Sequence, residues 1–314
     1  MQKRLSLIKP STREFVNEAR KVKGYTLFDL VHGYIYARWS HFYIGTGIGT
    51  RNKWLSRGVF PVVERIGRLL KGKPRPAEET IEFADTYHGK AVPLKTATQL
   101  VSVRESINLG DLEKVIPYKK ARDLIFQNPD HIAVLDCPCR VARENPCLPL
   151  DVCLVIGEPF AGFIIEHQPQ RARWITSDEA AKILEEEDAR GHVHHAFFKD
   201  AMLGRFYAIC NCCSCCCGAM QAHRNGTPML ASSGYLAQVD EALCIQCGEC
   251  EATCQFGALA MGENAMQVDS GKCMGCGVCV SHCAQDAIRL ELAPEKGMPL
   301  ELEKLIEEAA QAAR

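Results

Sequence analysis

A repeat near the C-terminus constrains this chain more than any other feature of its sequence. The copies start 29 residues apart, at Cys244 and at Cys273. The first reads Cys244-Ile-Gln-Cys247-Gly-Glu-Cys250-Glu-Ala-Thr-Cys254, and the second reads Cys273-Met-Gly-Cys276-Gly-Val-Cys279-Val-Ser-His-Cys283. Both follow the spacing C-x2-C-x2-C-x3-C. The register continues past the thiols, because Ala258 in the first copy aligns with Ala287 in the second.

The spacing within each copy favours iron–sulfur ligation. Three cysteines at two-residue intervals let a tight loop wrap one cubic cluster, and the fourth begins a helix that points away and reaches the other cube. Thiolate sulfur is a soft ligand suited to iron in a cluster. We expect one [4Fe-4S] cluster on Cys244, Cys247, Cys250 and Cys283. We expect the other on Cys273, Cys276, Cys279 and Cys254.

The repeat resembles the bacterial two-cluster ferredoxin domain over residues 235–292. The resemblance implies a βαββαβ unit that transfers single electrons between two nearby cubes. One feature departs from the family: the proline that usually follows the fourth cysteine is Gln255 here and Ala284 in the second copy. That proline is not a ligand, so ligation is unaffected. A pair of zinc knuckles is the alternative, but zinc uses C-x2-C pairs separated by a longer gap.

Ten further cysteines lie upstream of the repeat. The chain has 18 in all and none before Cys137. The ten are Cys137, Cys139, Cys147, Cys153, Cys210, Cys212, Cys213, Cys215, Cys216 and Cys217. Adjacent side chains diverge, so the 210–217 run cannot serve a single cube. We expect one or two more iron–sulfur centres, with the first four thiols as one set, the 210–217 run as another, or an exchange between them. Buried free thiols and a copper or zinc store are the alternatives.

Candidate catalytic side chains lie close to these thiols in sequence. His192, His194 and His195 could ligate metal or donate protons, although a surface loop or a packing role is the more ordinary expectation for each. Arg140 adjoins Cys139 and could neutralise an anionic cluster or hold a substrate carboxylate. The charge run 185–188 is expected on a solvated helix face.

Composition excludes several classes of protein. The net charge of −1 does not favour nucleic acid. No stretch approaches 18 apolar residues, so we expect no transmembrane segment, and the N-terminus lacks the pattern of a secretory signal. The sequence has no glycine-rich phosphate loop, so it does not predict a flavin or nicotinamide site. Clustered thiols in such a chain indicate metal ligands in a reducing compartment, so we expect a cytoplasmic protein, suited to an anaerobic lifestyle.

Local patterns predict an α+β protein in which short strands lead into cysteine-rich loops, with the small βαββαβ dicluster domain added. Strand-like apolar runs occur at 132–135, 152–156 and 206–209, each beside cysteines. A helix is expected at 11–24, with a Ser11–Glu14 capping box and Gly24 as its end. Another is expected at 177–190, capped by Thr176.

The expected organisation has four parts. Residues 1–130 form a helical, aromatic and basic region, residues 131–225 a cysteine-rich α/β metal-binding region, residues 235–292 the dicluster domain, and residues 293–314 an amphipathic helix. A linker is expected around 225–234. The basic stretch 51–75 could contact an anionic membrane surface or an acidic partner, or form a core-packing helix with a solvated basic face.

These patterns together predict an iron–sulfur electron-transfer protein or oxidoreductase subunit. It would relay electrons between the ferredoxin module and the upstream centre, with a redox protein or other oxidoreductase subunits as partners. One alternative is a reductase of a disulfide or small molecule at the upstream centre. The other is a metal-handling or redox-sensing protein.

Overall fold

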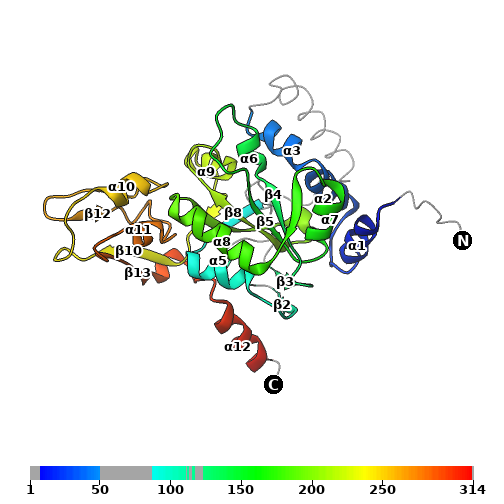
Figure 1. The fold of residues 1–314 in the computed structure, drawn as a ribbon. Helices are drawn as coiled ribbons and strands as arrows, with labels where there is room; N and C mark the ends of the chain where they lie inside the picture. The colour runs from blue at the N-terminus through cyan, green and yellow to red at the C-terminus, as the bar shows by residue number, and fades with distance from the viewer. Residues whose placement is uncertain (1–7, 50–86, 111, 113–114, 117–122, 313–314) are drawn as a thin grey trace, which may run out of the picture.

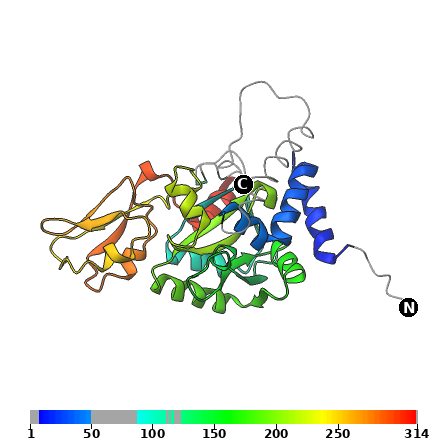
Figure 2. The same cartoon turned by 90° about the horizontal axis from the view of Figure 1, so that it is seen from above.

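The computed structural model describes residues 8–49, 87–110, 112, 115–116 and 123–312. In these residues a seven-stranded sheet with helices on both faces forms a large unit, and four short strands with two helices form a small one (Figure 1). The predicted α+β class is confirmed. The small unit and the N-terminal helices lie at opposite ends of the molecule in both views (Figure 2).

The large sheet has the strand order β6-β4-β5-β8-β7-β1-β9. Its strands are β1 (Tyr87–Ala91), β4 (Ile132–Asp136), β5 (Asp151–Ile156), β6 (Ala172–Ile175), β7 (Val193–Lys199), β8 (Arg205–Cys212) and β9 (Leu230–Ala231). Neighbouring strands are antiparallel except for the β1–β9 pair. The central strands are buried almost throughout, because both faces of the sheet are covered.

Side chains alternate between two apolar cores along each strand. On β4, Ala133 and Leu135 enter one core, and Ile132 and Val134 enter the other. The first core also takes residues of α1 (Pro10–Ala19), α2 (Leu27–Arg38), α3 (Ser40–Gly47), α7 (Phe160–His167) and α9 (Gly218–Arg224). The second takes residues of α5 (Leu94–Val101), β2 (Ile107–Leu109), β3 (Leu124–Phe126), α8 (Ser177–Ala189) and α12 (Leu302–Ala312). The short turns are α6 (Pro138–Val141), η2 (Asp200–Met202) and η3 (Pro294–Lys296).

The small unit contains the cysteine repeat. Its elements in chain order are β10 (Tyr235–Val239), α10 (Glu249–Thr253), β11 (Leu259–Met261), β12 (Met266–Val268), α11 (Val278–Ser281) and β13 (Ile288–Leu292). β10 pairs with β13 and β11 with β12, both antiparallel. Gly248 and Gly277 precede the two helices at φ of 81° and 87°. Glycine adopts this conformation without steric cost, which explains the glycine in each copy of the repeat.

Several predicted elements agree with the structure. The three apolar runs form β4, β5 and β8. Helix α8 covers the predicted segment, and the Thr176 hydroxyl accepts a hydrogen bond from the Glu179 amide at 3.1 Å. The C-terminal amphipathic helix predicted at 293–314 begins only at Leu302, as α12, because a 3-10 turn, η3, and an irregular stretch precede it.

The first predicted helix differs from the structure. Helix α1 begins at Pro10, with Lys9 as its N-cap, and ends at Ala19 rather than at Gly24. Ser11 makes no capping box; its amide donates to Oε2 of Glu166 on α7 at 2.9 Å, and its hydroxyl donates to the same oxygen. Proline is favoured in the first turn of a helix, so the helix begins at Pro10 and Ser11 lies inside it. The Ser11 amide is therefore paired with Glu166 of α7 and not with a side chain of its own helix.

Two expected boundaries fall inside the large sheet. Strand β1 precedes residue 130 but pairs with β7, and the expected linker at 225–234 contains β9, which pairs with β1. Pairing between distant segments has no local signature, so composition alone placed these boundaries wrongly. The basic stretch 51–75 lies outside the described residues. No helix among the residues described has the length and apolar character needed to cross a membrane.

Candidate metal centres

The eight repeat cysteines line two small cavities of about 20 Å³ each. Cys244, Cys247, Cys250 and Cys283 line one, here called the first quartet. Cys254, Cys273, Cys276 and Cys279 line the other, the second quartet. Each set takes three cysteines from one copy of the repeat and the fourth from the other copy, which is the crossed grouping expected from the spacing.

The surroundings of these thiols fit iron–sulfur clusters. The backbone amide of Ala258 donates to Sγ of Cys254 at 3.3 Å, and that of Ala287 donates to Sγ of Cys283 at 3.3 Å, at equivalent positions of the repeat. Such donors stabilise negative charge on sulfur. Burial raises the pKa of the Cys276 thiol to about 12, so its thiolate needs a neighbouring cation. Soft thiolates around a buried cavity are suitable ligands for cluster iron.

The two quartets differ in their exposure. Cys247 of the first quartet is exposed, and the neighbouring Leu243 and Ile245 side chains are 48% and 65% exposed. Cys273 and Cys279 of the second quartet are buried, and Phe256 lines the same cavity. The first quartet therefore has one exposed cysteine, whereas no cysteine of the second quartet is exposed.

Gln255 connects the second quartet to the large unit. Its side-chain amide donates to the carbonyl of Gly191 at 2.9 Å, and its Oε1 accepts a hydrogen bond from the amide of Ser214 at 2.8 Å. Ser214 lies inside the upstream 210–217 cysteine run. The residue that replaces the proline of the resembled family thus joins the two cysteine-rich regions.

Three residues of the small unit, Phe256, Ser281 and His282, complete this contact. The ring of Phe256 lies 6.3 Å from that of His195 and 6.4 Å from that of His223, centroid to centroid. Asp188 of α8 accepts a hydrogen bond from the Ser281 hydroxyl at 2.5 Å, and its carbonyl accepts one from Nε2 of His282 at 3.0 Å. The small unit therefore packs against α8 and β7, through Phe256 and through residues 281–282.

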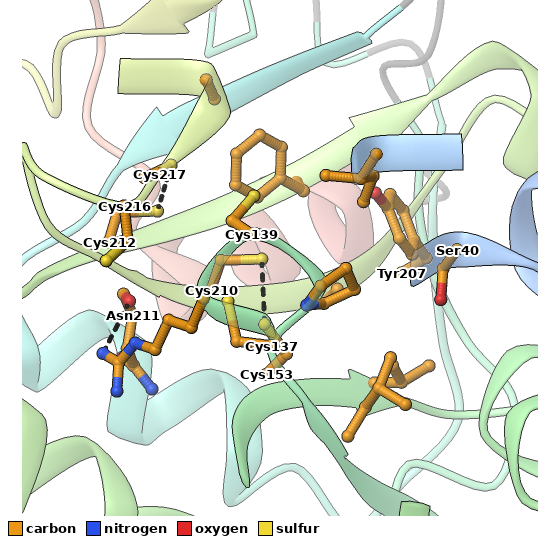
Figure 3. A pocket seen from close by; sticks show the side chains of 18 of the residues that line it. Ser40, Cys137, Cys139, Cys153, Tyr207, Cys210, Asn211, Cys212, Cys216 and Cys217 are labelled. Carbon is orange, nitrogen blue, oxygen red and sulfur yellow. Dashed lines mark hydrogen bonds between the residues drawn. The ribbon is translucent and has the colours of Figure 1, made fainter. Parts of the chain in front are cut away.

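The upstream cysteines surround a cavity of about 70 Å³ (Figure 3). Six thiols come to it from the end of β4, from α6, β5 and β8, and from the residue before α9: Cys137, Cys139, Cys153, Cys210, Cys212 and Cys217. Sulfur atoms of Cys153 and Cys210 are 4.0 Å apart, and those of Cys212 and Cys217 are 3.3 Å apart. We call these thiols the six-cysteine group. Cys213 and Cys216 also contribute to the cavity wall.

The remaining four upstream cysteines form a separate cluster. Sγ atoms of Cys147, Cys213, Cys215 and Cys216 all lie within 4.8 Å of one another. We call them the outer quartet, because Cys215 is exposed. The structure therefore exchanges thiols between the two sequence segments: Cys147 joins the later run, and the other early cysteines join Cys210, Cys212 and Cys217.

Arg140 and Glu187 form a buried ion pair beside the cavity. Both side chains are at most 1% exposed, and Nδ1 of His192 lies 2.7 Å from Oε2 of Glu187 and 3.0 Å from the Arg140 guanidinium. Burial alone would raise the pKa of Glu187, but hydrogen bonds from His192 and Arg140 outweigh it and hold that pKa below its ordinary value. Arg140 is a positive charge next to the thiols, as expected, although it is fixed by Glu187.

His194 and His195 lie on buried strand β7, and His192 directly precedes it; all three are buried and none lies on a surface loop. Nδ1 of His194 is 2.6 Å from Oδ1 of Asn211. His195 lies opposite Cys210 in the sheet register, and its ring nitrogens have no hydrogen-bond partner among the described residues. Burial, followed by His194 and His223, lowers the pKa of His195 to about 3, so its ring is neutral at physiological pH.

The acidic run on α8 is only half solvated. Glu185 and Glu186 are exposed, whereas Glu187 and Asp188 are buried. The expected solvated face is therefore wrong for the last two residues, because Glu187 pairs with Arg140 and Asp188 contacts the small unit.

Sequence reasoning missed a polar group on the opposite wall of the cavity. Tyr36 and Tyr207 line it, and their hydroxyls are 2.7 Å apart. The Nζ of Lys199 lies 5.1 Å from the centre of the Tyr36 ring, and burial lowers the pKa of Lys199 to about 8. Residues 25–50 are rich in aromatic side chains, and Tyr36 is one of them, but no local sequence pattern links this segment to the cysteines.

Comparison with known proteins bears on the small unit. No curated protein and no solved structure matches the chain. Residues 243–293 match the family described as the 4Fe-4S dicluster domain. That segment contains all eight cysteines of the first and second quartets. The molecule is an iron–sulfur protein of the electron-transfer class, and its residues 243–293 are a ferredoxin-type dicluster domain.

Proposed function

We propose that this protein relays electrons between the two clusters of its ferredoxin-type domain and a further iron–sulfur centre in the upstream cavity. In this proposal the elements from β10 to β13 are the βαββαβ unit. The first and second quartets each hold one [4Fe-4S] cluster, which supplies one-electron transfer. The protein acts as a subunit or partner of a larger oxidoreductase. A reducing, cytoplasmic setting follows, because thiolate ligands must stay reduced.

The contact made by Gln255 is the observation that carries the proposal. This residue follows a second-quartet cysteine directly, and its side chain accepts a hydrogen bond from Ser214, which lies between two cysteines of the outer quartet. Phe256 continues the contact against His195, whose strand neighbour is Cys210 of the six-cysteine group. A short path of covalent and hydrogen bonds therefore connects the two cysteine-rich regions.

The exposed end of the small unit is the proposed site of exchange with an external redox protein. Cys247 is exposed there, with Leu243 and Ile245 beside it. Exposed apolar side chains around a redox centre allow a partner to approach closely and exclude water. Electrons would pass between the partner, the first quartet, the second quartet and the upstream cavity, in either direction.

Four of the six cysteines around the upstream cavity would hold the third centre. They are fixed by strand ends and short helices, which is a rigid support for a redox site. The Arg140 guanidinium, itself held by Glu187, supplies positive charge next to Cys137 and Cys153. That charge favours the anionic, ligated form of the thiols.

Substitution at the contact tests the relay. The full chain is prepared without oxygen, and its reduction is followed by rapid mixing and low-temperature electron paramagnetic resonance. We expect Gln255→Ala to leave reduction of the ferredoxin clusters unchanged and to slow reduction of the upstream centre. Gln285→Ala is the matched control, because this exposed glutamine lines the first-quartet cavity and faces no upstream thiol. Equal rates in both variants, or no more than about eight irons per chain, the content of the two ferredoxin clusters alone, would refute the relay.

A further inference from the structure

We propose that the outer quartet binds one tetrahedrally coordinated zinc ion, separate from the iron–sulfur centres. This site goes beyond the relay, whose ligands all come from the other fourteen cysteines. The proposal rests on the spacing of the four sulfur atoms, on the hydrogen bonds around them and on their position at the rim of the upstream cavity.

The sulfur atoms of the outer quartet have the spacing of ligands to one ion. Sγ of Cys215 lies 3.2 Å from that of Cys147, 3.3 Å from that of Cys213 and 3.7 Å from that of Cys216. Sγ of Cys216 lies 3.8 Å from that of Cys147. Zinc–sulfur bonds of about 2.3 Å in a tetrahedron place the sulfurs about 3.8 Å apart. The quartet is therefore close to zinc dimensions.

A cubic cluster needs more room than this. Each thiolate of a [4Fe-4S] cluster binds a different iron at a different corner, so its four sulfurs stand farther apart than those around one ion. Among the described residues, the outer quartet alone brings three or more potential ligand atoms within 4.8 Å of one another. The first and second quartets, which match a dicluster family, do not. One molecule thus contains two sizes of four-cysteine site.

Neighbouring groups are arranged around the outer quartet as around an anionic metal site. The amide of Cys147 donates toward Sγ of Cys216 at 3.5 Å. The Arg143 guanidinium donates to the carbonyl of Cys216 at 2.9 and 3.2 Å, and that of Arg224 donates to the carbonyl of Ser214. Four thiolates around a divalent ion leave two negative charges. The two guanidinium groups offset that charge.

The position of the outer quartet indicates a structural role. Cys147 lies in the loop between α6 and β5, and the other three lie in the turn between β8 and α9. An ion held by all four would tie this loop to that turn at the rim of the six-cysteine cavity, whose wall includes Cys213 and Cys216. Four protein thiolates leave no open coordination position, which is typical of structural zinc.

Metal analysis of the full chain, purified without oxygen, tests the proposal. We expect about one zinc per chain, and X-ray absorption at the zinc edge should show four sulfur neighbours at about 2.3 Å. This measurement needs no variant and reads zinc independently of the cluster iron. Zinc absent from the protein, a single iron without sulfide at the quartet, or zinc with nitrogen or oxygen neighbours would overturn the assignment.

Paired variants assign the ion to its ligands. We expect C147S/C215S to lose zinc by at least about tenfold, because half of the ligands are gone, and to keep its sulfide. Cys247→Ser is the matched control at an exposed ferredoxin cysteine, and it should lose iron and sulfide and keep zinc. Loss of iron and sulfide together in C147S/C215S, with zinc unchanged, would show a cluster at the outer quartet and overturn the proposal. The relay would survive that result.

Discussion

The two cysteine-rich regions of this chain gather their thiols by different means. In the small unit, two copies of one local pattern place eight thiols between Cys244 and Cys283, on turns that begin short helices. In the large unit, thiols come from strand ends and loops that are distant in sequence, as in the contact between Cys147 and Cys215, 68 residues apart. Spacing therefore predicts ligand sets where the contacts are local and leaves them open where a sheet creates them.

The difference extends to what stabilises each unit. The small unit buries a core of eight residues, of which Cys250, Cys273 and Cys279 are three. The large unit has two extensive apolar cores on either side of its sheet. Domains of this small size seldom fold on hydrophobic burial alone and need metals or other cross-links. Metal should therefore be essential to the fold of the small unit and not to that of the sheet.

Removal of iron should have the largest effect. When the protein is treated with a chelator and an oxidant, we expect amide hydrogens of residues 235–292 to lose protection from exchange, because their core loses its ligated cysteines. Those of β4, β5, β7 and β8 should keep theirs. Hydrogen exchange with mass spectrometry measures both in one sample. Equal loss of protection in the two units would show that the sheet also depends on iron.

The buried ion pair of Arg140 and Glu187 should give the next largest effect. Glu187→Ala leaves Arg140 as an uncompensated buried charge, so we expect the free energy of unfolding to fall by about 3–5 kcal/mol. Glu186→Ala on the same helix is the control; Glu186 contacts Lys182 and Arg190 at the surface, and its loss should cost at most about 1 kcal/mol. Denaturant unfolding followed by circular dichroism compares them. Similar losses of unfolding free energy in the two variants would contradict the view that Glu187 compensates a buried charge.

The same ion pair makes the free energy of unfolding depend on pH in the acidic range. The pKa of Glu187 is lowered in the folded state from its ordinary value of 4.5. Its contribution is therefore complete above pH 4.5 and is lost as the pH falls through the lower, folded-state pKa. Glu187→Gln should remove this part of the acid dependence, which repeated unfolding at several acidic pH values would measure.

The buried, neutral ring of His195 should produce a smaller loss of stability at milder pH, because only the unfolded chain can protonate it there. Its pKa is lowered from 6.5 to about 3 by burial, so the unfolded chain binds a proton below pH 6.5 and the folded chain does not. Stability is therefore complete above pH 6.5 and falls below it by up to about 1.4 kcal/mol per pH unit. His195→Phe should flatten the dependence of the free energy of unfolding on pH between about pH 5 and 6.5. If the free energy of unfolding depended on pH in the same way in the unsubstituted protein and in His195→Phe, the lowered pKa of His195 would be contradicted.

Sequence patterns predicted the candidate cysteine ligands and the strands beside them better than the contacts between distant segments. Cysteine spacing indicated the crossed quartets, and apolar runs marked β4, β5 and β8, because these signals are local. The place of β1 in the sheet could not be predicted, since five residues of strand carry no information about distant partners. Glu187 and Asp188 belong to a run of four acids that has no mark of burial; their partners, Arg140 and Ser281, come from other parts of the chain.

The contact between the units should give the smallest effect. Ser281→Ala removes the hydrogen bond to Asp188 and leaves the thiols in place. We expect this variant to weaken docking of the small unit by about 1 kcal/mol, the usual net value of one hydrogen bond. Faster exchange at the amides of residues 188–192 would report the loss, and Ser270→Ala, elsewhere on the same unit, is the control. Because the substitution spares all ligands, slower reduction of the upstream centre in Ser281→Ala with unchanged iron content would show that docking itself sets the rate between the two cysteine-rich regions.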